Sequence, residues 1–415
     1  MNLLSLFSGC GGMDIGFEGG FTCFKRSINP EMHPQWIAED MGEIVRVAHT
    51  GFHTVFANDI RPDAKAAWVS YFKKRLPNAE EIYHIASIVD LVKRAKNGEQ
   101  VFPENIDVVT GGFPCQDFSI AGKRKGFHSE KSHNGGRLDA GEPSVESRGQ
   151  LYMWMRDVIT LTEPALFIAE NVKGLTNLED VKEVIERDFA NAANGGYLVV
   201  PAQVLHAADY GVPQSRERVI FLGFKKAALK QEALSALQEK EIPAEYDPYP
   251  PKTHSFTVKD PSLCKPITCR EAFWGLQEPN DTEDPSQKKY SKAKYMGKHC
   301  QGQTEVRADS IGPTIRSEHH GNIEFRRLSQ EHGGVQVEEL AAGLQERRLT
   351  VRECARIQTF PDDYQFILPG KKGLVGVSAS DAYKIIGNAV PCVLAYNVAK
   401  HISEKWNLYF KENAE

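Results

Sequence analysis

The sequence predicts an α/β fold, in which a Rossmann-like, mostly parallel sheet carries helices on both faces and joins a smaller irregular domain. Three observations predict it. Strand-like and helix-like segments alternate from residue 2 to residue 224, as is typical of parallel strands linked by helices. The periodic pattern is lost between residues 225 and 346. It returns from residue 347 in two helical stretches.

Each element of the first half is predicted from its own periodicity. Short runs rich in β-branched and aromatic residues predict strands over residues 2–8, 54–59, 106–110, 165–172, 197–205 and 218–224. Longer stretches with helical spacing predict helices over residues 11–20, 61–76, 149–162 and 178–192. Ligands of such sheets bind at the carboxyl ends of the strands, so the residues that follow each strand are the first candidates for a site.

The C-terminal pattern predicts a return to the first domain. Residues 347–360 and 378–402 have helical periodicity. We therefore expect a catalytic domain formed by residues 1–224 and 347–415, with residues 225–346 as a second, smaller domain. Residues 22–51 and 128–146 have the character of insertions, and the second has no hydrophobic periodicity.

Composition narrows the class of protein. Hydrophobic residues make up 41% and charged residues 25% of the 415-residue chain, which is ordinary for a soluble globular protein. No basic residue precedes the short apolar N-terminal run, and no run is long enough to span a membrane. The eight cysteines form no CxxC pair, so we expect no metal site and a reducing, cytoplasmic location.

Charge is unevenly distributed. The net charge is −5, which argues mildly against nucleic-acid binding by the chain as a whole. Residues 286–327, however, contain nine Lys or Arg against four Asp or Glu. This segment either meets phosphates or is a solvated basic face.

The first strand ends in a glycine-rich turn, "FSGCGG", that opens a helix. Glycines allow close approach to a ligand, and a helix N-terminus offers free N–H groups. Asp59 ends the second strand, where a carboxylate can bind ribose hydroxyls. Because the turn lacks the full GxGxxG pattern, a nucleoside without a diphosphate fits these two observations best.

A thiol, a carboxyl and two guanidiniums follow or precede other strands. Cys115 lies in "GGFPCQ", Glu170 and Asn171 end the strand at 165–172, and Arg216 and Arg218 stand at the start of the last strand. In a parallel sheet we expect these strand ends to share one edge. Each residue alone has an ordinary structural explanation, and their joint occurrence favours a reactive site.

These blocks, in this order, resemble the DNA (cytosine-5) methyltransferase family of bacterial restriction–modification systems. The resemblance runs through "LFSGCGGMDIGF", "ANDI", "GGFPCQDFSIAGKRKGF", "ENV", "QSRERV", "RRLTVRECARIQTFPDDY" and "IIGNAVP". It implies the class I methyltransferase fold, S-adenosylmethionine as the methyl donor and a target-recognition role for residues 225–346. Only "PTIRSEHHGN" matches weakly within that region.

The resemblance also implies catalytic roles. Carbon 5 of cytosine is a poor nucleophile until a thiolate adds to carbon 6, and this attack falls to Cys115. Glu170 would bond or protonate N3, and Arg218 would contact O2 and support the thiolate. Arg216 would fix the base and backbone, and Asn171 would hold Glu170 and the turn.

Family matching further implies binding residues. Those expected at the methyl donor are Phe7, Gly9, Gly11, Gly12, Asp59, Ile60, Pro114, Asn388 and Ala389. Those expected at DNA are Gln116, Ser119, Lys123, Arg124, Arg148, Gln301, Thr314 and Arg316, with Gln303 and Arg307 as further base-reading candidates. The target base must leave the duplex to reach the thiol, and residues 116–148 are expected to close over it.

Two positions depart from the family pattern. Ser5 stands where many relatives carry an acid near the methionine moiety, and Ser87 where they carry an Asp for the adenine amine. We expect both serines to lower the affinity for the methyl donor.

Three other functions compete. An RNA cytosine-5 methyltransferase would carry a Cys-Phe-Thr signature that this chain lacks. A catalytically dead DNA-binding subunit would lack the thiol or carboxylate. A nicotinamide-dependent oxidoreductase explains only the glycine turn. We therefore expect a monomeric enzyme that acts on double-stranded bacterial chromosomal DNA, paired functionally with a cognate restriction endonuclease.

Overall fold

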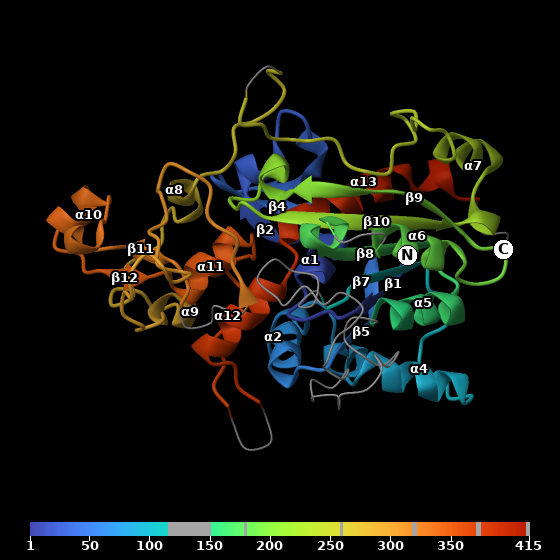
Figure 1. Cartoon of the computed structure of the whole chain (residues 1–415), viewed down its shortest axis with the longest axis horizontal. Coiled ribbons are helices and arrows are strands. Elements are labelled where there is room, and N and C mark those ends of the chain that lie inside the picture. The colour runs from blue at the N-terminus through green and yellow to red at the C-terminus, as the bar shows by residue number, and fades with distance from the viewer. Residues whose placement is uncertain (115–150, 178–180, 258–259, 318–321, 371–374, 412–415) are drawn as a thin grey trace.

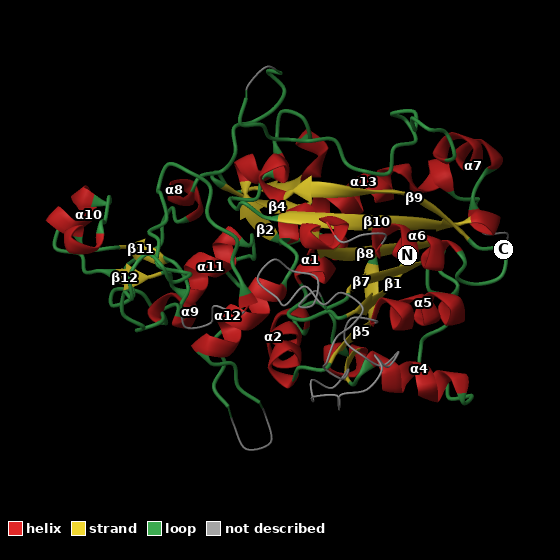
Figure 2. Ribbon diagram, in the orientation of Figure 1, coloured by secondary structure: helices red, strands yellow, loops and turns green. Residues whose placement is uncertain are grey.

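A seven-stranded mixed sheet forms the centre of the molecule (Figures 1 and 2). The computed structural model describes residues 1–114, 151–177, 181–257, 260–317, 322–370 and 375–411. The strand order is β6-β5-β1-β7-β8-β10-β9. The strands are β1 Asn2–Leu6, β5 His53–Asp59, β6 Tyr83–Ile85, β7 Val108–Gly112, β8 Leu166–Val172, β9 Tyr197–His206 and β10 Glu217–Lys225. The prediction of a mostly parallel α/β sheet is confirmed.

One strand runs against the other six, and its direction matters for the site. β10 pairs antiparallel with both β8 and β9. The sequence interpretation placed Arg216 and Arg218 at the shared edge because it treated their strand as parallel to the others. The predicted position holds, but the assumed strand direction was wrong. Residues that precede a parallel strand would lie at the opposite edge, and only the reversal of β10 brings Arg218 opposite Val172 at the carboxyl end of β8.

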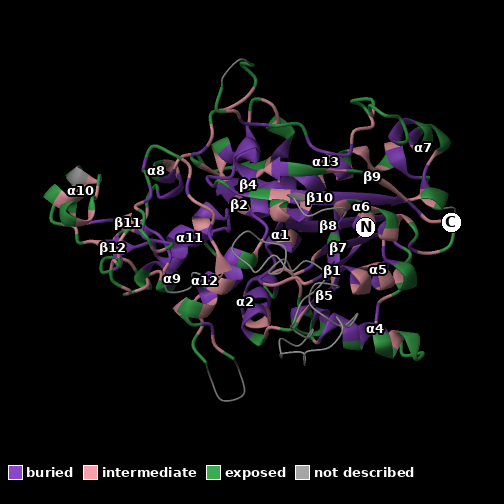
Figure 3. Ribbon diagram, in the orientation of Figure 1, coloured by how far each residue is buried: buried purple, intermediate pink, exposed green. Residues whose placement is uncertain are grey.

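Helices cover both faces of the sheet because successive strand residues point to opposite sides. Leu3, Ile168 and Ile220 enter one buried cluster, and their neighbours Leu4 and Phe167 enter the other. The first cluster is covered by α1 Gly12–Glu18, α2 Pro62–Phe72 and α13 Cys392–Tyr409, and the second by α4 Ile88–Lys96, α5 Leu151–Thr162 and α6 Val181–Ala190. Figure 3 shows this buried interior in purple. α3, Ala79–Ile82, precedes β6.

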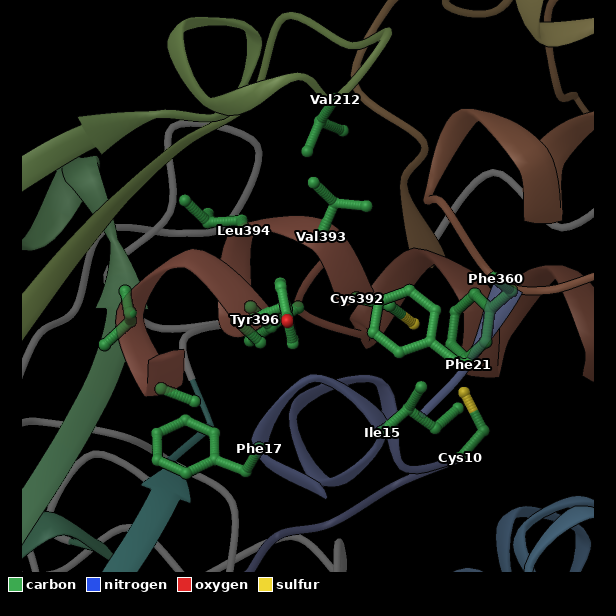
Figure 4. Close-up of a cluster of buried hydrophobic side chains, with 14 of the residues drawn as sticks. Cys10, Ile15, Phe17, Phe21, Val212, Phe360, Cys392, Val393, Leu394 and Tyr396 are labelled. Atoms are coloured by element: carbon green, nitrogen blue, oxygen red, sulfur yellow. The ribbon is translucent and has the colours of Figure 1, made fainter. Parts of the chain in front are cut away.

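The C-terminal helix α13 returns to the N-terminal part of the chain. It packs so closely on α1 that a Cβ on Gly16 would lie 2.4 Å from the Cβ of Ala395. Figure 4 shows the apolar side chains at this contact, among them Ile15 of α1 and Tyr396 of α13. The remaining C-terminal helices are α11 Val351–Ile357 and α12 Ala379–Asn388. α11 begins with a capping box, because the Thr350 hydroxyl accepts from the Glu353 backbone N–H and the Glu353 carboxylate accepts from that of Thr350.

The first inserted segment forms a small antiparallel sheet beside α13. Its strands are β2 Thr22–Phe24, β3 Ile37–Asp40 and β4 Ile44–Val47, with η1 Lys25–Ile28 and η2 Pro34–Trp36 between β2 and β3. Trp36 packs edge-on against Tyr396, and its Nε1 donates to Glu404 at 2.9 Å. Asn29 donates to the carbonyl of Thr253 at 2.9 Å. The inserted segment therefore contacts both α13 and the stretch around Thr253, which follows the last strand of the large sheet. The second insertion, residues 128–146, lies outside the described residues.

The irregular region lies to the left in Figure 1 and contains only short elements. They are α8 Cys269–Ala272, α9 Pro285–Lys288, β11 Phe325–Arg327, η8 Gln330–His332, α10 Val337–Ala341 and β12 Arg347–Arg348. Buried arginines link them, and Arg347 pairs with Glu353 at 2.9 Å and with Glu278 at 3.0 Å. Such a network fixes the relative positions of short elements.

The segment between the large sheet and this region stays close to the sheet. η6 Lys226–Ala228 and α7 Gln231–Leu237 follow β10, and Leu229 forms a β-bridge with Phe410. The boundary at residues 224 and 225 remains a prediction. Among the described helices, none combines the length and apolar character needed to cross a bilayer.

Candidate active site at the carboxyl edge of the sheet

A cleft of about 1170 Å³ opens at the carboxyl edge of the central strands. One wall consists of residues that follow β1, β5, β7 and β8 and residues that begin β10. The other wall consists of residues 301, 314–317, 385 and 387–390. Residues far apart in sequence therefore meet across the cleft, as expected for a ligand site at this edge.

The glycine turn after β1 has a positive backbone φ at three residues. Phe7 has φ of 54°, Gly9 52° and Gly11 80°. Phe7, Gly9 and Gly12 line the cleft. A Cβ on Gly9 would meet nothing within 4 Å, whereas one on Gly12 would lie 2.3 Å from the Val390 carbonyl oxygen. Gly9 therefore leaves space for a ligand, and Gly12 permits close packing.

Gly11 is not among the cleft-lining residues, although it was predicted to bind the ligand. It is the N-cap of α1 with left-handed backbone geometry. A Cβ there would lie 2.6 Å from Cδ1 of Trp68. Its role in the described structure is to let α2 pack against the turn.

Asp59 and Ile60 form the next part of the floor. The Asp59 carboxylate accepts hydrogen bonds of 3.0 Å from the backbone N–H groups of Gly9 and Arg61. Burial raises the pKa of Asp59, while these donors oppose the rise. Ile60 is 48% exposed and lines the cleft, as do Asn388 and Ala389 on the opposite wall. A carboxylate beside an exposed apolar side chain suits a ribose and a purine.

Sequence reasoning missed Asn58, which also lines the cleft. Its side-chain amide donates to the carbonyls of Ala86 at 2.8 Å and His84 at 3.2 Å. It thereby ties β5 to the chain that enters α4. Its place directly before Asp59 in the sequence is a signal that could have indicated it.

The two departures from the family pattern both line the cleft. The Ser5 hydroxyl donates to Oδ1 of Asp14 at 2.5 Å, and Trp68 Nε1 donates to Oδ2 of the same carboxyl at 2.7 Å. Burial raises the pKa of Asp14 to about 7. Sequence reasoning missed Asp14, although it lies in "GGMD". Ser87 is the N-cap of α4 and accepts from the Val89 backbone N–H at 3.3 Å.

A buried ion pair lies at the other end of the cleft. Arg218 Nε lies 2.6 Å from Glu170 Oε1, and both side chains are nearly buried. Burial raises the pKa of Glu170, and the charges of Arg218 and Arg216 oppose the rise. A Cβ on Gly112 would lie 2.8 Å from Glu170 Oε2. The glycine before the Phe-Pro-Cys turn therefore gives the carboxyl its space.

Arg216 and Asn171 donate hydrogen bonds to backbone carbonyls near the Glu170–Arg218 pair. Arg216 is 1% exposed and donates to the carbonyls of Ile315 at 3.0 Å and Gly387 at 2.9 Å. The Asn171 amide donates to the Phe113 carbonyl at 3.2 Å. Asn171 is not among the cleft-lining residues, whereas Glu170 is.

Pro114 lines the cleft, and it is the last described residue before a gap. Six predicted site residues lie outside the described residues, namely Cys115, Gln116, Ser119, Lys123, Arg124 and Arg148. Their roles remain predictions.

Three of the predicted DNA contacts line the far wall, namely Gln301, Thr314 and Arg316. The Thr314 hydroxyl donates to the Ser215 carbonyl, so it is tied to the segment that carries Arg216. Gln303 is only 2% exposed and accepts from the Met296 backbone N–H at 2.8 Å. It supports the loop and does not line the cleft, nor does Arg307.

Comparison with known proteins identifies relatives along most of the chain. Residues 42–404 match the profile of the C-5 cytosine-specific DNA methylase family. The Type II methyltransferase M.BspRI of Lysinibacillus sphaericus is 32% identical, over 99% of this chain and 84% of that protein. M.NgoPII of Neisseria gonorrhoeae, also a Type II methyltransferase, is 29% identical over 97% of this chain and 96% of its own length.

Solved structures share the fold. The S. pombe Dnmt2 methyltransferase superposes with a TM-score of 0.54 at 18% identity, over 98% of this chain and 99% of the other. The Entamoeba histolytica methyltransferase EhMeth gives a TM-score of 0.51 at 13% identity, over 98% and 99% of the two chains. The arrangement of strands and helices described above is therefore that of known methyltransferases.

Proposed function

The chain belongs to the C-5 cytosine-specific DNA methylase family, and we propose that it transfers a methyl group from S-adenosylmethionine to carbon 5 of a cytosine flipped out of double-stranded DNA. One observation carries the proposal. A buried carboxyl paired with an arginine, Glu170 with Arg218, shares a single cleft with the nucleoside-sized floor formed by Gly9 and Asp59. Base chemistry and a nucleoside ligand can therefore meet in one site.

The residues at the glycine-turn end fit the proposed methyl donor. Gly9 leaves open space where a side chain would stand, and the half-buried Asp59 carboxylate can accept ribose hydroxyls. Phe7 and the exposed Ile60 offer apolar surface for a purine. When bound, S-adenosylmethionine supplies an electrophilic methyl group.

Cys115 supplies the nucleophile. Its thiolate attacks carbon 6 of the cytosine, forming a sulfur–carbon bond and placing the displaced electron pair on the ring, so that carbon 5 becomes nucleophilic. After carbon 5 accepts the methyl group, a base, for which water suffices, removes the carbon-5 proton. The electron pair of the broken carbon–hydrogen bond forms the double bond between carbons 5 and 6 and expels the thiolate. N3 returns its proton to the Glu170 carboxylate, which restores the enzyme.

Glu170 and Arg218 stabilise the charge that the attack creates. Burial raises the pKa of Glu170, which favours a carboxyl that can give a proton to N3. The Arg218 guanidinium lies against the same carboxyl, from where it can bind O2. Asn171 supports the turn before Cys115 through the Phe113 carbonyl. Arg216 secures the two segments of the opposite wall.

DNA enters from the side of residues 301–317. Thr314, Gln301 and Arg316 line the cleft there, within the basic segment of residues 286–327 that suits phosphate contact. Gln116, Ser119, Lys123, Arg124 and Arg148 contribute from the segment after Cys115. A base inside a duplex cannot reach the cleft, so the target is flipped.

In the cell the protein acts as a monomer and protects host DNA from a cognate restriction endonuclease. The test is base-resolution sequencing of 5-methylcytosine in DNA from a methylation-free host that expresses the protein, with Cys115→Ala as the control. Methylation at one recurring short sequence, lost in the variant, is expected. Label transfer into RNA as efficient as into DNA, or undiminished methylation by Cys115→Ala, would overturn the proposal.

A further inference from the structure

Two buried glutamines hold the backbone of one wall of the cleft. Gln214 precedes β10 and Gln358 follows α11, and both are 0% exposed. Gln214 Nε2 donates to Gln358 Oε1 at 2.8 Å. The two residues are 144 positions apart in sequence, so only the fold brings them together.

Each amide is also bonded to backbone on its own side. Gln214 Oε1 accepts from the Ile315 backbone N–H at 3.0 Å, and Nε2 also donates to the Ile357 carbonyl at 3.2 Å. Gln358 Nε2 donates to the carbonyls of Ile386 at 2.7 Å and Ala389 at 3.1 Å. The side-chain oxygen of each glutamine therefore accepts a hydrogen bond while its nitrogen donates others. A 180° flip of either amide would place donor against donor and acceptor against acceptor.

The backbone segments that these amides hold line neighbouring parts of one wall of the cleft. Ile315 lies between Thr314 and Arg316, in the segment proposed to meet DNA. Ala389 lies in the turn proposed to meet the methyl donor. An unbroken hydrogen-bonded path therefore runs from one ligand's segment through Gln214 and Gln358 to the other's.

The two segments also touch each other directly. Arg216 bonds to Ile315 and Gly387 at once. A Cβ on Gly387 would lie 2.5 Å from the backbone carbon of Arg316. Packing of this kind is not continuously deformable, so a shift of one segment must displace the other or break buried hydrogen bonds.

We propose that Gln214 and Gln358 are positioning residues that couple binding of the methyl donor to binding of DNA. Breaking a hydrogen bond of a buried side-chain amide leaves its donor or acceptor with neither a protein partner nor water, which costs about 1–3 kcal/mol. A ligand that orders one segment therefore orders the other, and the effect must be reciprocal. This coupling rests on the proposed function, which assigns the two segments to the two ligands.

The experiment measures the dissociation constant of S-adenosylhomocysteine with and without a saturating duplex that carries the methylated sequence. It then measures the reverse, DNA affinity with and without S-adenosylhomocysteine. The native protein is expected to bind each ligand about 5- to 150-fold more tightly when the other is bound. Gln358→Met is expected to lower both factors in equal proportion, because it removes the side-chain hydrogen bonds of Gln358 and keeps most of the volume, while the direct link through Arg216 remains.

Gln287→Met is the matched control. Gln287 is 1% exposed, donates to the Gln277 carbonyl at 2.7 Å and accepts from the Thr350 hydroxyl at 2.6 Å. Neither partner lies in the two cleft segments. It is expected to lower the thermal midpoint comparably and to leave the coupling factor unchanged. If Gln358→Met does not fold, Gln214→Glu tests the same link, since it retains an acceptor for Ile315 and loses both N–H donors.

Equal coupling in Gln358→Met and the native protein would overturn the inference, as would equal loss of coupling in Gln287→Met. So would a native protein that methylates DNA and shows no coupling. A native protein that neither methylates DNA nor binds S-adenosylhomocysteine would instead show that the proposed function itself has failed.

Discussion

The hydroxyl of Ser5 donates a 2.5 Å hydrogen bond to Oδ1 of Asp14, behind the floor of the cleft. Ser5 occupies the position at which related enzymes were expected to carry an acid. A carboxyl does lie beside Ser5, from the first turn of α1, but it is buried and does not line the cleft. The Ser8 hydroxyl also donates to Ser5 Oγ at 2.8 Å. Ser5 therefore lines the cleft with a hydroxyl that is hydrogen-bonded to a buried carboxyl and to the hydroxyl of Ser8.

Asp14→Asn is predicted to change how stability depends on pH. Burial raises the pKa of Asp14 from 3.8 to about 7, so the folded state holds a proton that the unfolded state loses between these values. The free energy of unfolding therefore falls as pH rises through that window, by up to about 1.4 kcal/mol per pH unit. Above the window this contribution is constant.

Urea titrations at pH 5 and pH 8 check this. Relative to the native protein, Asp14→Asn should gain about 3 kcal/mol between the two pH values. Acids that do not interact with Asp14 titrate identically in both proteins and cancel from the difference. Parallel pH curves would show that Asp14 is already ionised at pH 5.

Glu170→Gln is predicted to lower kcat about 10²- to 10⁴-fold with little change in the affinity for S-adenosylhomocysteine. The amide retains the size of the carboxyl but cannot give up a proton at N3. Single-turnover methylation, with S-adenosylhomocysteine affinity measured by calorimetry, separates the two effects. A variant with native kcat would remove Glu170 from the chemistry.

Arg218→Met is predicted to move the alkaline limb of the kcat profile to higher pH. The guanidinium lowers the pKa of Glu170, so its removal raises that pKa, and an acid needed in its protonated form stays active to higher pH. The rate itself should fall because Arg218 is also assigned to O2. A limb that moves to lower pH would contradict the assignment of Glu170 as the acid.

Alanine substitutions at Gly9 and at Gly12 should have different effects, the first on affinity for the methyl donor and the second on stability. Gly9→Ala meets no atom within 4 Å but must adopt φ of 52°, which costs about 1 kcal/mol, and its methyl group would occupy space proposed for the methyl donor. Gly12→Ala would collide with the Val390 carbonyl and should cost about 1–3 kcal/mol of stability.

Thermal midpoints and S-adenosylhomocysteine affinities of the two variants check this difference. Gly9→Ala should lose affinity more than tenfold with a modest fall in midpoint, whereas Gly12→Ala should mainly lose stability. Native affinity in Gly9→Ala would exclude the donor from that space.

Arg348→Ala is predicted to weaken DNA binding. Arg348 is 1% exposed and donates to four carbonyls, those of Ala293, Lys294, Gly302 and Ile323. Gly302 follows Gln301, which lines the cleft. Losing these bonds should disorder that wall, at a cost of about 3 kcal/mol in stability, and raise the dissociation constant for DNA more than tenfold.

Duplex binding by fluorescence anisotropy, with S-adenosylhomocysteine affinity measured alongside, tests Arg348→Ala. Arg270→Ala is the control, because Arg270 pairs with Asp309 on the surface of the same region. Equal weakening in both variants would indicate a general effect of charge.

The sequence alone determined which polar residues end or begin strands. Glycines at 9 and 12, Asp59, Glu170 and Arg218 were all identified before the fold was known, because the period of two in strands and the turn residues beside them are local properties. Local periodicity also predicted helices on both faces, and Leu3 and Leu4 do enter different clusters.

Only the tertiary structure decided the contacts between distant residues. The reversal of β10, the Ser5–Asp14 bond and the Gln214–Gln358 pair depend on strand direction and helix packing, which no run of neighbouring residues encodes. Gln301 and Gln303 are the same residue type two positions apart, yet Gln301 lines the cleft and Gln303 is buried. Burial is a property of the assembled fold, and in this protein it also raises the pKa values of Asp14 and Glu170.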